Sequence, residues 1–329
     1  MKKAVLLLPE ESRKVIYGEA HVKSLRKLVK LDDCCRLVGD LKALKPHLAD
    51  AEIICSGWGM MKMDEDFLAA APRLKAVFYG AGSVRGFVTD AFWDKDILLT
   101  SVWSANGIPV AETTVALIVL CVRKAFDCNR LTKQKRTFAR ADNMRGLYGA
   151  RIGVIGAGMV GRRVLEMLRN YQVETFCYDP FLSEAKARKL GAKLIGLDEM
   201  FRSCDVVSLH AANIPSTQHM IRGRHFRSMK DGAVFINTAR GRIIKEDEMI
   251  RELKKGRIFA CIDVTDPEPP RPDNPLYDLE NVFLTPHIAG AVGRDCLRLG
   301  EYVVEEVRRH LKGEPPAYPV TRDMMEWMA

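Results

Sequence analysis

The chain has 329 residues, which is long enough for two domains and a sizeable core. Its hydrophobic content of 47% and charged content of 28% are ordinary for a globular protein in water. The net charge of +9 is concentrated in residues 123–151, where nine Lys and Arg accompany two Asp, so the composition argues against a nucleic-acid binder with a basic surface all round.

Three further features concern the location of the protein and its metal content. The opening residues MKKAVLLLPEESRK contain too short an apolar run for a secretory signal, and the longest later apolar run, 115–122, is far below membrane-spanning length. The nine cysteines include no CxxC pair and no Cys/His cluster with zinc-like spacing. We therefore expect a cytoplasmic protein with free thiols, no membrane contact and no metal site.

Short apolar runs typical of strands alternate with longer amphipathic runs typical of helices in the first third of the chain. The strand-like runs are residues 4–8, 36–38, 52–56, 75–79 and 98–102. Helical patterns lie between them, for example at 25–30 and 64–71. This alternation predicts a parallel sheet with helices on both faces.

The alternation starts again after a long helix expected over residues 110–123. Six further strands are expected at 152–155, 174–178, 206–210, 234–237, 259–263 and 282–284. Six strands with intervening helices match a complete doubly wound dinucleotide fold. The last helical pattern, 294–312, cannot form a domain by itself and must pack on the first sheet. The predicted fold class is α/β, with two doubly wound parallel-sheet domains, two helical crossings and a cleft between the domains.

The run RIGVIGAGMVGRRV places Gly156, Gly158 and Gly161 between a strand and a helix. Such glycines allow a tight turn and let the backbone approach a pyrophosphate at the helix N-terminus. The alternative is a tight turn that binds no ligand. Asp179 ends the next strand and is expected to accept hydrogen bonds from the adenosine ribose hydroxyls. Because no Arg follows Asp179, we expect NAD rather than NADP.

Charged side chains follow three other predicted strands. Arg240 stands just beyond strand 234–237, and Glu268 follows strand 259–263 on a proline-stiffened loop. His287 lies in LTPHIAG after the last strand. The carboxyl ends of parallel strands meet at one edge of a sheet, where ligands bind. Taken singly, each residue has an ordinary alternative, namely a surface Arg, an exposed turn acid and a core His.

The combination of these three groups beside a nicotinamide suits the reduction of a 2-oxo acid. An Arg clamps the carboxylate with two parallel hydrogen bonds. A His supplies the proton, and a Glu holds the imidazole and favours its charged form.

Together these stretches resemble the D-isomer-specific 2-hydroxyacid dehydrogenase family. The similarity runs from about residue 52 to residue 320 and includes GAG at 80–82, VAETTVALIVL from Val110, VIGAGMVG, NTARG, DVTDPEP and TPHIAG. The resemblance implies a Rossmann NAD-binding domain over 106–294, inserted in a flavodoxin-like substrate domain over 1–105 and 295–329. Because the sequence stops soon after the last expected helix, we expect the extra C-terminal regulatory domain of some phosphoglycerate dehydrogenases to be absent.

The same resemblance implies roles by position. Arg240 is expected to bind the substrate carboxylate and carbonyl, with the backbone amides of Gly82 and Ser83. His287 is expected to be the acid/base with Glu268 as its partner. Asp263 is expected to meet the nicotinamide carboxamide. The residues expected to touch the cofactor are Ala81, Gly156, Gly158, Met159, Val160, Gly161, Asp179, Ala211, Thr238, Ala239, Arg240, Asp263, His287 and Gly290.

The predicted function is the NAD-dependent interconversion of a small 2-oxo acid, such as glyoxylate or hydroxypyruvate, and its D-2-hydroxy acid. Two alternatives remain, which are a dehydrogenase of another small anion, such as formate or phosphite, and an NAD-binding sensor or corepressor. Glu268 argues against formate, because formate enzymes resemble this pattern with Gln in place of the acid. The exact acid, the working direction and a pocket role for Arg85 or Trp58 stay open.

The resemblance also points to a homodimer, with residues 123–151 in its interface or rim. A solvated basic face is the other interpretation of this segment. A nucleic-acid binder built on it is a distant third function, and salt-dependent DNA binding would support it. We expect no nucleic-acid partner.

Overall fold

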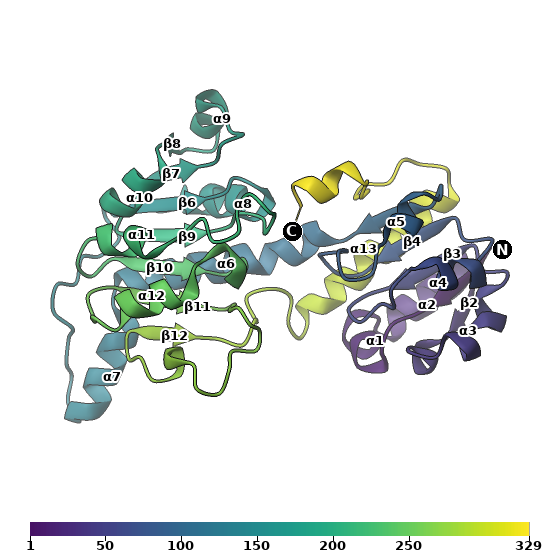
Figure 1. Ribbon diagram of the computed structural model, residues 1–329, viewed down its shortest axis with the longest axis horizontal. Coiled ribbons are helices and arrows are strands. Elements are labelled where there is room, and N and C mark those ends of the chain that lie inside the picture. The colour runs from purple at the N-terminus through teal and green to yellow at the C-terminus, as the bar shows by residue number, and fades with distance from the viewer. Residues whose placement is uncertain (329) are drawn as a thin grey trace. The chain divides into compact units, whose positions relative to one another are not determined.

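The computed structural model describes residues 1–328, which form two compact units. Unit 1 comprises Met1–Gly107 and the chain from Ala291 onward, and unit 2 comprises Ile108–Gly290. Each unit contains one parallel sheet with helices around it (Figure 1). The predicted α/β class with two parallel sheets is confirmed.

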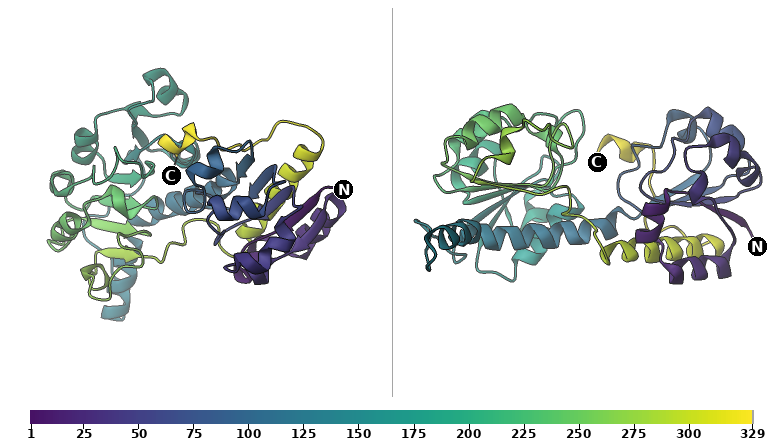
Figure 2. Two further views of the ribbon diagram at one scale, coloured as in Figure 1. Left: turned by 45° about the vertical axis from the view of Figure 1, so that its right-hand side comes forward. Right: turned by 90° about the horizontal axis from the view of Figure 1, so that it is seen from below.

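Unit 1 has five parallel strands in the order β2-β1-β3-β4-β5. The strands are β1 (Lys3–Leu6), β2 (Lys30–Asp33), β3 (Ile53–Ser56), β4 (Ala76–Tyr79) and β5 (Leu98–Ser101). The helices are α1 (Glu10–Ile16), α2 (Glu19–Leu28), α3 (Leu41–Leu48), α4 (Glu65–Ala70), α5 (Asp90–Trp93) and α13 (Asp295–Leu311), with short 3-10 helices η1 (Cys35–Leu37) and η4 (Asp323–Glu326). Helix α13 packs against α1, α2 and β4, and Figure 2 shows it in yellow-green beside the purple N-terminal helices.

Unit 2 has seven parallel strands in the order β12-β11-β10-β9-β6-β7-β8. The strands are β6 (Arg151–Ile155), β7 (Glu174–Tyr178), β8 (Lys193–Leu194), β9 (Val206–Leu209), β10 (Val234–Asn237), β11 (Phe259–Ile262) and β12 (Val282–Leu284). The helices are α7 (Ala125–Lys135), α8 (Met159–Leu168), α9 (Glu184–Lys189), α10 (Leu197–Ser203), α11 (Gly223–Ser228) and α12 (Glu246–Leu253), with 3-10 helices η2 (Gly241–Ile243) and η3 (Pro275–Tyr277). Helix α6 (Trp103–Val122) begins in unit 1 and ends in unit 2.

The central strands of unit 2 are buried on both faces. Successive residues of one strand enter different cores, as Val206 and Val207 do on β9, and Val234 and Phe235 on β10. This is the pattern of a parallel sheet covered by helices on each side. Polar chemistry is therefore left to the loops at the strand ends, and the carboxyl ends of β6, β9, β10, β11 and β12 share one edge.

The prediction of a strand at 36–38 is wrong, because residues Cys35–Leu37 form the 3-10 helix η1 and the edge strand is β2, Lys30–Asp33. The sequence of β2 is KLDD, and none of its residues is buried, so it lacks the apolar signal of a core strand. Strand β8 has two residues and was not predicted either. Both strands lie at sheet edges, where apolar runs are not required.

Helix α6 is longer and more apolar than the run 115–122 suggests. Its most apolar 18-residue stretch has a mean hydropathy of 1.7. Within the described part of the chain, α6 is the one helix that is long and apolar enough to cross a membrane, judged by length and composition alone. Of that stretch, 56% is buried inside the structure, with Val115 and Ile118 in the core of unit 2. The core helix of a protein without a membrane span meets the same criterion, so the hydropathy of α6 is weak support for a span.

Candidate active site

The glycine loop between β6 and α8 has the geometry of a tight turn with open space above it. Gly156 has a φ of +89°, and a Cβ there would lie 2.7 Å from Ala211 N. A Cβ on Gly161 would lie 2.0 Å from the Gly156 carbonyl oxygen. At Gly158, by contrast, a Cβ would meet nothing within 4 Å. Gly156 and Gly161 are needed for packing, and Gly158 leaves the backbone accessible to a ligand.

Helix α8 begins at Met159, followed by Val160, and its N-cap residue makes no side-chain capping bond. Its first N–H groups have no partner inside the helix, and Gly158 directly before them borders open space. This cradle fits a dinucleotide pyrophosphate, because an uncapped helix N-terminus attracts phosphate.

Asp179 lies one residue beyond β7 and holds the glycine loop. Its Oδ2 accepts a hydrogen bond from the Ala157 amide at 2.7 Å, and Oδ1 accepts one from the Phe181 amide at 2.8 Å. The carboxylate thus fixes the turn from the neighbouring strand end, which the spacing of the motif did not indicate. Its predicted contact with the ribose hydroxyls stays a prediction.

Arg240 is presented by a turn that is fixed from two sides. The buried Asn237 side chain accepts from the Ala239 amide at 3.0 Å and donates to the Arg240 carbonyl at 3.1 Å. A Cβ on Gly241 would lie 2.1 Å from the Thr265 carbonyl carbon, so the two backbones are in direct contact. Only glycine permits this approach.

The guanidinium of Arg240 is partly buried and donates through Nη1 to the Ala239 carbonyl at 2.7 Å. Among residues 1–328, no carboxylate pairs with it at ion-pair distance. Burial lowers the pKa of Arg240, because desolvation disfavours the charged form, and the charge of Glu268 opposes this effect. A desolvated cation without a carboxylate partner favours the binding of an anion.

His287 is not a core residue. Its side chain is 46% exposed, and Nδ1 pairs with Glu268 Oε1, whose side chain is 41% exposed. His287 has a φ of +54°, a conformation that L residues rarely adopt. The structure thus joins the histidine to the predicted carboxylate and places both at the carboxyl ends of neighbouring strands, β11 and β12.

Asp263 organises the turn that carries His287. Its Oδ1 accepts from the Thr285 hydroxyl at 2.6 Å and from the Ile288 amide at 2.8 Å, and Oδ2 accepts from the Ala289 amide at 3.0 Å. Its carbonyl also accepts from the His287 amide at 2.9 Å. Asp263 is 5% exposed, so these bonds form where water competes little. The expected contact with the nicotinamide carboxamide stays a prediction beside this positioning role.

The remaining cofactor candidates of unit 2 also lie at strand ends or loop edges. The Thr238 hydroxyl is buried and bonds to Thr114 Oγ1 at 3.0 Å, so its side chain is turned into the core and its contact with a cofactor stays a prediction. Ala211 packs against Gly156, and Gly290 is the last residue of the unit. The nearby His210 is structural, because burial lowers its pKa to about 3 and Ser208 Oγ lies 2.8 Å from its Nε2.

Ala81, Gly82 and Ser83 lie in unit 1, directly after β4 and Gly80. Ser101 Oγ lies 2.8 Å from the Ala81 carbonyl and 2.5 Å from the Gly82 carbonyl, so both carbonyl groups point toward the Ser101 hydroxyl. Among residues 1–328, neither the Gly82 nor the Ser83 N–H donates to a protein acceptor. Free amides of this kind suit a carboxylate, and their role stays a prediction.

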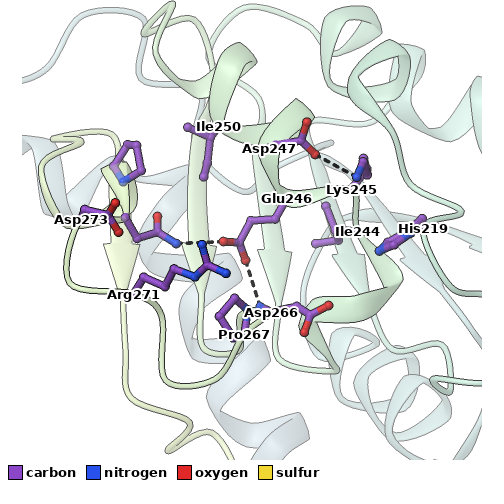
Figure 3. Close-up of a pocket in the computed structure, with 12 residues that line it drawn as sticks. His219, Ile244, Lys245, Glu246, Asp247, Ile250, Asp266, Pro267, Arg271 and Asp273 are labelled. Atoms are coloured by element: carbon purple, nitrogen blue, oxygen red, sulfur yellow. Dashed lines mark hydrogen bonds and ion pairs between the residues drawn. The ribbon is translucent and has the colours of Figure 1, made fainter.

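A cavity of about 640 Å³ lies beside this edge of unit 2 (Figure 3). Its lining includes Glu246, Asp266 and Pro267, the last two directly before Glu268 in the chain. Arg240, Glu268 and His287 do not line it. Glu246 bonds to the loop that carries Glu268, a contact that sequence reasoning missed.

One group of possible metal ligands occurs in the described residues although no metal site was expected. The ligand atoms of Asp32, Cys34 and His47 lie within 4.8 Å of one another. They come from β2, the following turn and α3, so no short spacing motif revealed them. Asp32 Oδ2 and His47 Nδ1 already pair at 2.7 Å, which accounts for two of the three residues.

Residues 115–289 match the model of the D-isomer specific 2-hydroxyacid dehydrogenase NAD binding domain, which is more than half of the 329 residues. The chain belongs to this family. Its unit 2 is the NAD-binding domain, and the resemblance drawn from the motifs is confirmed together with NAD as the cofactor.

Relatives of this chain include enzymes of several names. The D-3-phosphoglycerate dehydrogenase of Archaeoglobus fulgidus is 32% identical over 255 residues, which cover 77% of this chain and 48% of that protein. The glyoxylate reductase of Korarchaeum cryptofilum is 28% identical over 269 residues, which cover 80% of this chain and 81% of that protein. The chain spans about half the length of the curated phosphoglycerate dehydrogenases that it matches.

The fold is shared with the crystal structure of apo D-mandelate dehydrogenase from Rhodotorula graminis. The two chains match with a TM-score of 0.84 and 22% identity over 98% of each. At this identity the match concerns the fold.

Proposed function

We propose that the protein reduces a small 2-oxo acid to its D-2-hydroxy acid with NADH and catalyses the reverse reaction with NAD. One observation carries the proposal. The His287–Glu268 pair lies at the same sheet edge as the turn of Arg240, since β10, β11 and β12 are adjacent and parallel. An acid/base pair and an unpaired cation beside an NAD-binding turn are the groups that this reaction needs.

Arg240 binds the substrate carboxylate in this proposal. Its guanidinium lacks a carboxylate partner among the described residues, and burial makes the bare charge unfavourable. A substrate carboxylate would supply the missing charge through two parallel hydrogen bonds. The unpaired amides of Gly82 and Ser83 support unit 1 as the substrate domain.

His287 exchanges the proton in this proposal. Nδ1 is engaged by Glu268, so Nε2 is the ring nitrogen that is left for the substrate oxygen. Bound NADH supplies the hydride that adds to the carbonyl carbon. As that carbon is reduced, the carbonyl oxygen takes the proton from Nε2, and in the reverse direction the neutral imidazole takes it back. Glu268 stabilises the imidazolium by its negative charge.

We propose that the substrate is glyoxylate, hydroxypyruvate or a short relative. These acids share one carboxylate beside a carbonyl. The names of the relatives support this class, since they include glyoxylate reductase and D-3-phosphoglycerate dehydrogenase. The test is a panel of 2-oxo acids with NADH, with and without a phosphate group, followed by NADH absorbance. If none of these acids causes NADH to be oxidised, the proposal is contradicted.

We also propose a cytoplasmic homodimer with residues 123–151 at its interface or rim. No residue of helix α7 is buried, and Phe138 and Tyr148 are 101% and 86% exposed. Large exposed apolar side chains in one segment are typical of surfaces that bind a partner. The nine free cysteines support a reducing compartment.

A further inference from the structure

The loop that carries Glu268 has little packing of its own. Pro267, Glu268 and Pro269 are exposed, and so are residues 271–273. The Thr265 hydroxyl donates to the Pro267 carbonyl at 2.8 Å, and the Tyr277 hydroxyl donates to the Pro270 carbonyl at 3.3 Å, so both bonds come from residues close to the loop in the chain. Besides its pair with His287, Glu268 is positioned by the contacts that hold the ends of the loop.

Glu246, the first residue of α12, bonds to both ends of this loop through its carboxylate (Figure 3). Its Oε2 accepts from the Asp266 backbone amide at 3.1 Å, and its Oε1 accepts from Asn274 Nδ2 at 2.9 Å. Asn274 is itself oriented, because its Oδ1 accepts from the Leu276 amide at 2.9 Å. One side chain thus closes residues 266–274, hereafter the Glu268 loop.

The turn of Arg240 contacts the start of the same loop and the residue before it. Gly241 touches the Thr265 backbone, and Arg242 Nε lies 3.4 Å from Asp266 Oδ1. Glu246 follows this turn directly at the start of α12. The segment 240–246 therefore packs against the Glu268 loop. Within this segment, Glu246 makes the two hydrogen bonds that join the ends of the loop.

A general electrostatic role for Glu246 does not explain this geometry. The first turn of α12 contains three acids, and negative charge at a helix N-terminus is favourable wherever in the turn it lies. Asp247, the next residue, pairs with Lys245 at 3.5 Å and with Arg251 at 3.1 Å and makes no bond to the Glu268 loop. Asp247 is therefore a matched control with the same charge on the same turn.

We propose that Glu246 is a positioning residue that holds the Glu268 loop and so keeps Glu268 against His287. The catalytic consequence rests on the proposed function, whereas the hold on the loop does not. A Glu246→Gln side chain keeps the shape but has one acceptor and one NH₂ group, so one of the two loop donors loses its partner.

The first test is hydrogen–deuterium exchange of the full-length protein, which needs no activity. Glu246→Gln is expected to speed exchange in peptides that cover residues 264–276, and Asp247→Asn is expected to leave them unchanged. Equal exchange in wild type and Glu246→Gln would overturn the proposal. If Glu246→Gln does not fold, Asn274→Ala removes one of the two bonds and is measured in the same way.

The second test separates positioning from a merely structural role by a double-mutant cycle. Glu246→Gln is expected to lower kcat roughly 10- to 100-fold, the scale of a misplaced catalytic group, with little change in the KM for NADH. In a Glu268→Gln background the same substitution should have little further effect. An equal loss in both backgrounds, or an equal loss from Asp247→Asn, would overturn the proposal. A wild-type protein that reduces no 2-oxo acid would refute the proposed function, while the exchange experiment would still decide the hold on the loop.

Discussion

Replacing Arg240 by Gln should weaken substrate binding without destabilising the protein. The guanidinium is partly buried, its one protein hydrogen bond is to the Ala239 carbonyl, and no carboxylate of residues 1–328 pairs with it. Burial lowers the pKa of Arg240 because the charged form is desolvated. Removing this charge relieves a desolvation penalty, so we expect the melting temperature to stay the same or to rise.

The effect on substrate follows from the two lost bonds. A hydrogen bond to a charged group contributes about 1.5–3 kcal/mol, so loss of both prongs lowers kcat/KM by roughly 10²- to 10⁴-fold. Arg240→Lys keeps the charge but loses the fork, and it should lower kcat/KM by roughly 10- to 100-fold.

The assay is steady-state reduction of the most active 2-oxo acid with NADH, together with thermal melting of the same samples. Arg251→Gln is the matched control, since Arg251 pairs with Asp247 on the surface of α12. Unchanged apparent affinity in Arg240→Lys would show that the carboxylate is held elsewhere. A lower melting temperature with unchanged kcat/KM in Arg240→Gln would make Arg240 a structural residue.

Cofactor choice, assembly and the His287–Glu268 pair give three more tests. Catalytic efficiency with NADH should exceed that with NADPH at least about tenfold, or about 1.4 kcal/mol, because the Asp179 carboxylate repels a 2′-phosphate; equal efficiencies would show that Asp179 does not face the ribose. Light scattering at micromolar concentration should give a dimer mass, and a monomer mass would end the dimer proposal. Glu268→Gln should lower kcat for reduction, since the imidazolium loses its negative partner, and an unchanged kcat would argue against the pair.

Much of unit 2 was predictable because its central strands are buried on both faces and read as continuous apolar runs. The strand-end rule also brought Arg240 and His287 to one edge, because parallel strands share their carboxyl ends. The edge strand β2 was not predicted, because it has one open edge and its polar sequence KLDD gives no apolar signal.

The bonds that fix the site could not be predicted, because each joins loops that only tertiary packing brings together. Asp263 binds the amides of Ile288 and Ala289, and Asp179 binds the amide of Ala157. Backbone amides carry no sequence signal, so an acid that accepts from them looks like any turn acid. Glu246 was missed for the same reason, since it was one of three acids at a helix start.

The most direct test of the proposed catalytic role is the turnover of His287→Ala, measured per folded molecule on a sample whose melting temperature is also recorded. We expect turnover to fall by about 10²- to 10⁴-fold, the usual share of general acid–base catalysis. The melting temperature should stay close to that of the wild type, because the imidazole is 46% exposed. NADH affinity should change much less than turnover. A stable and fully active His287→Ala protein, or one that loses activity only by unfolding, would contradict the assignment of His287 as the proton donor.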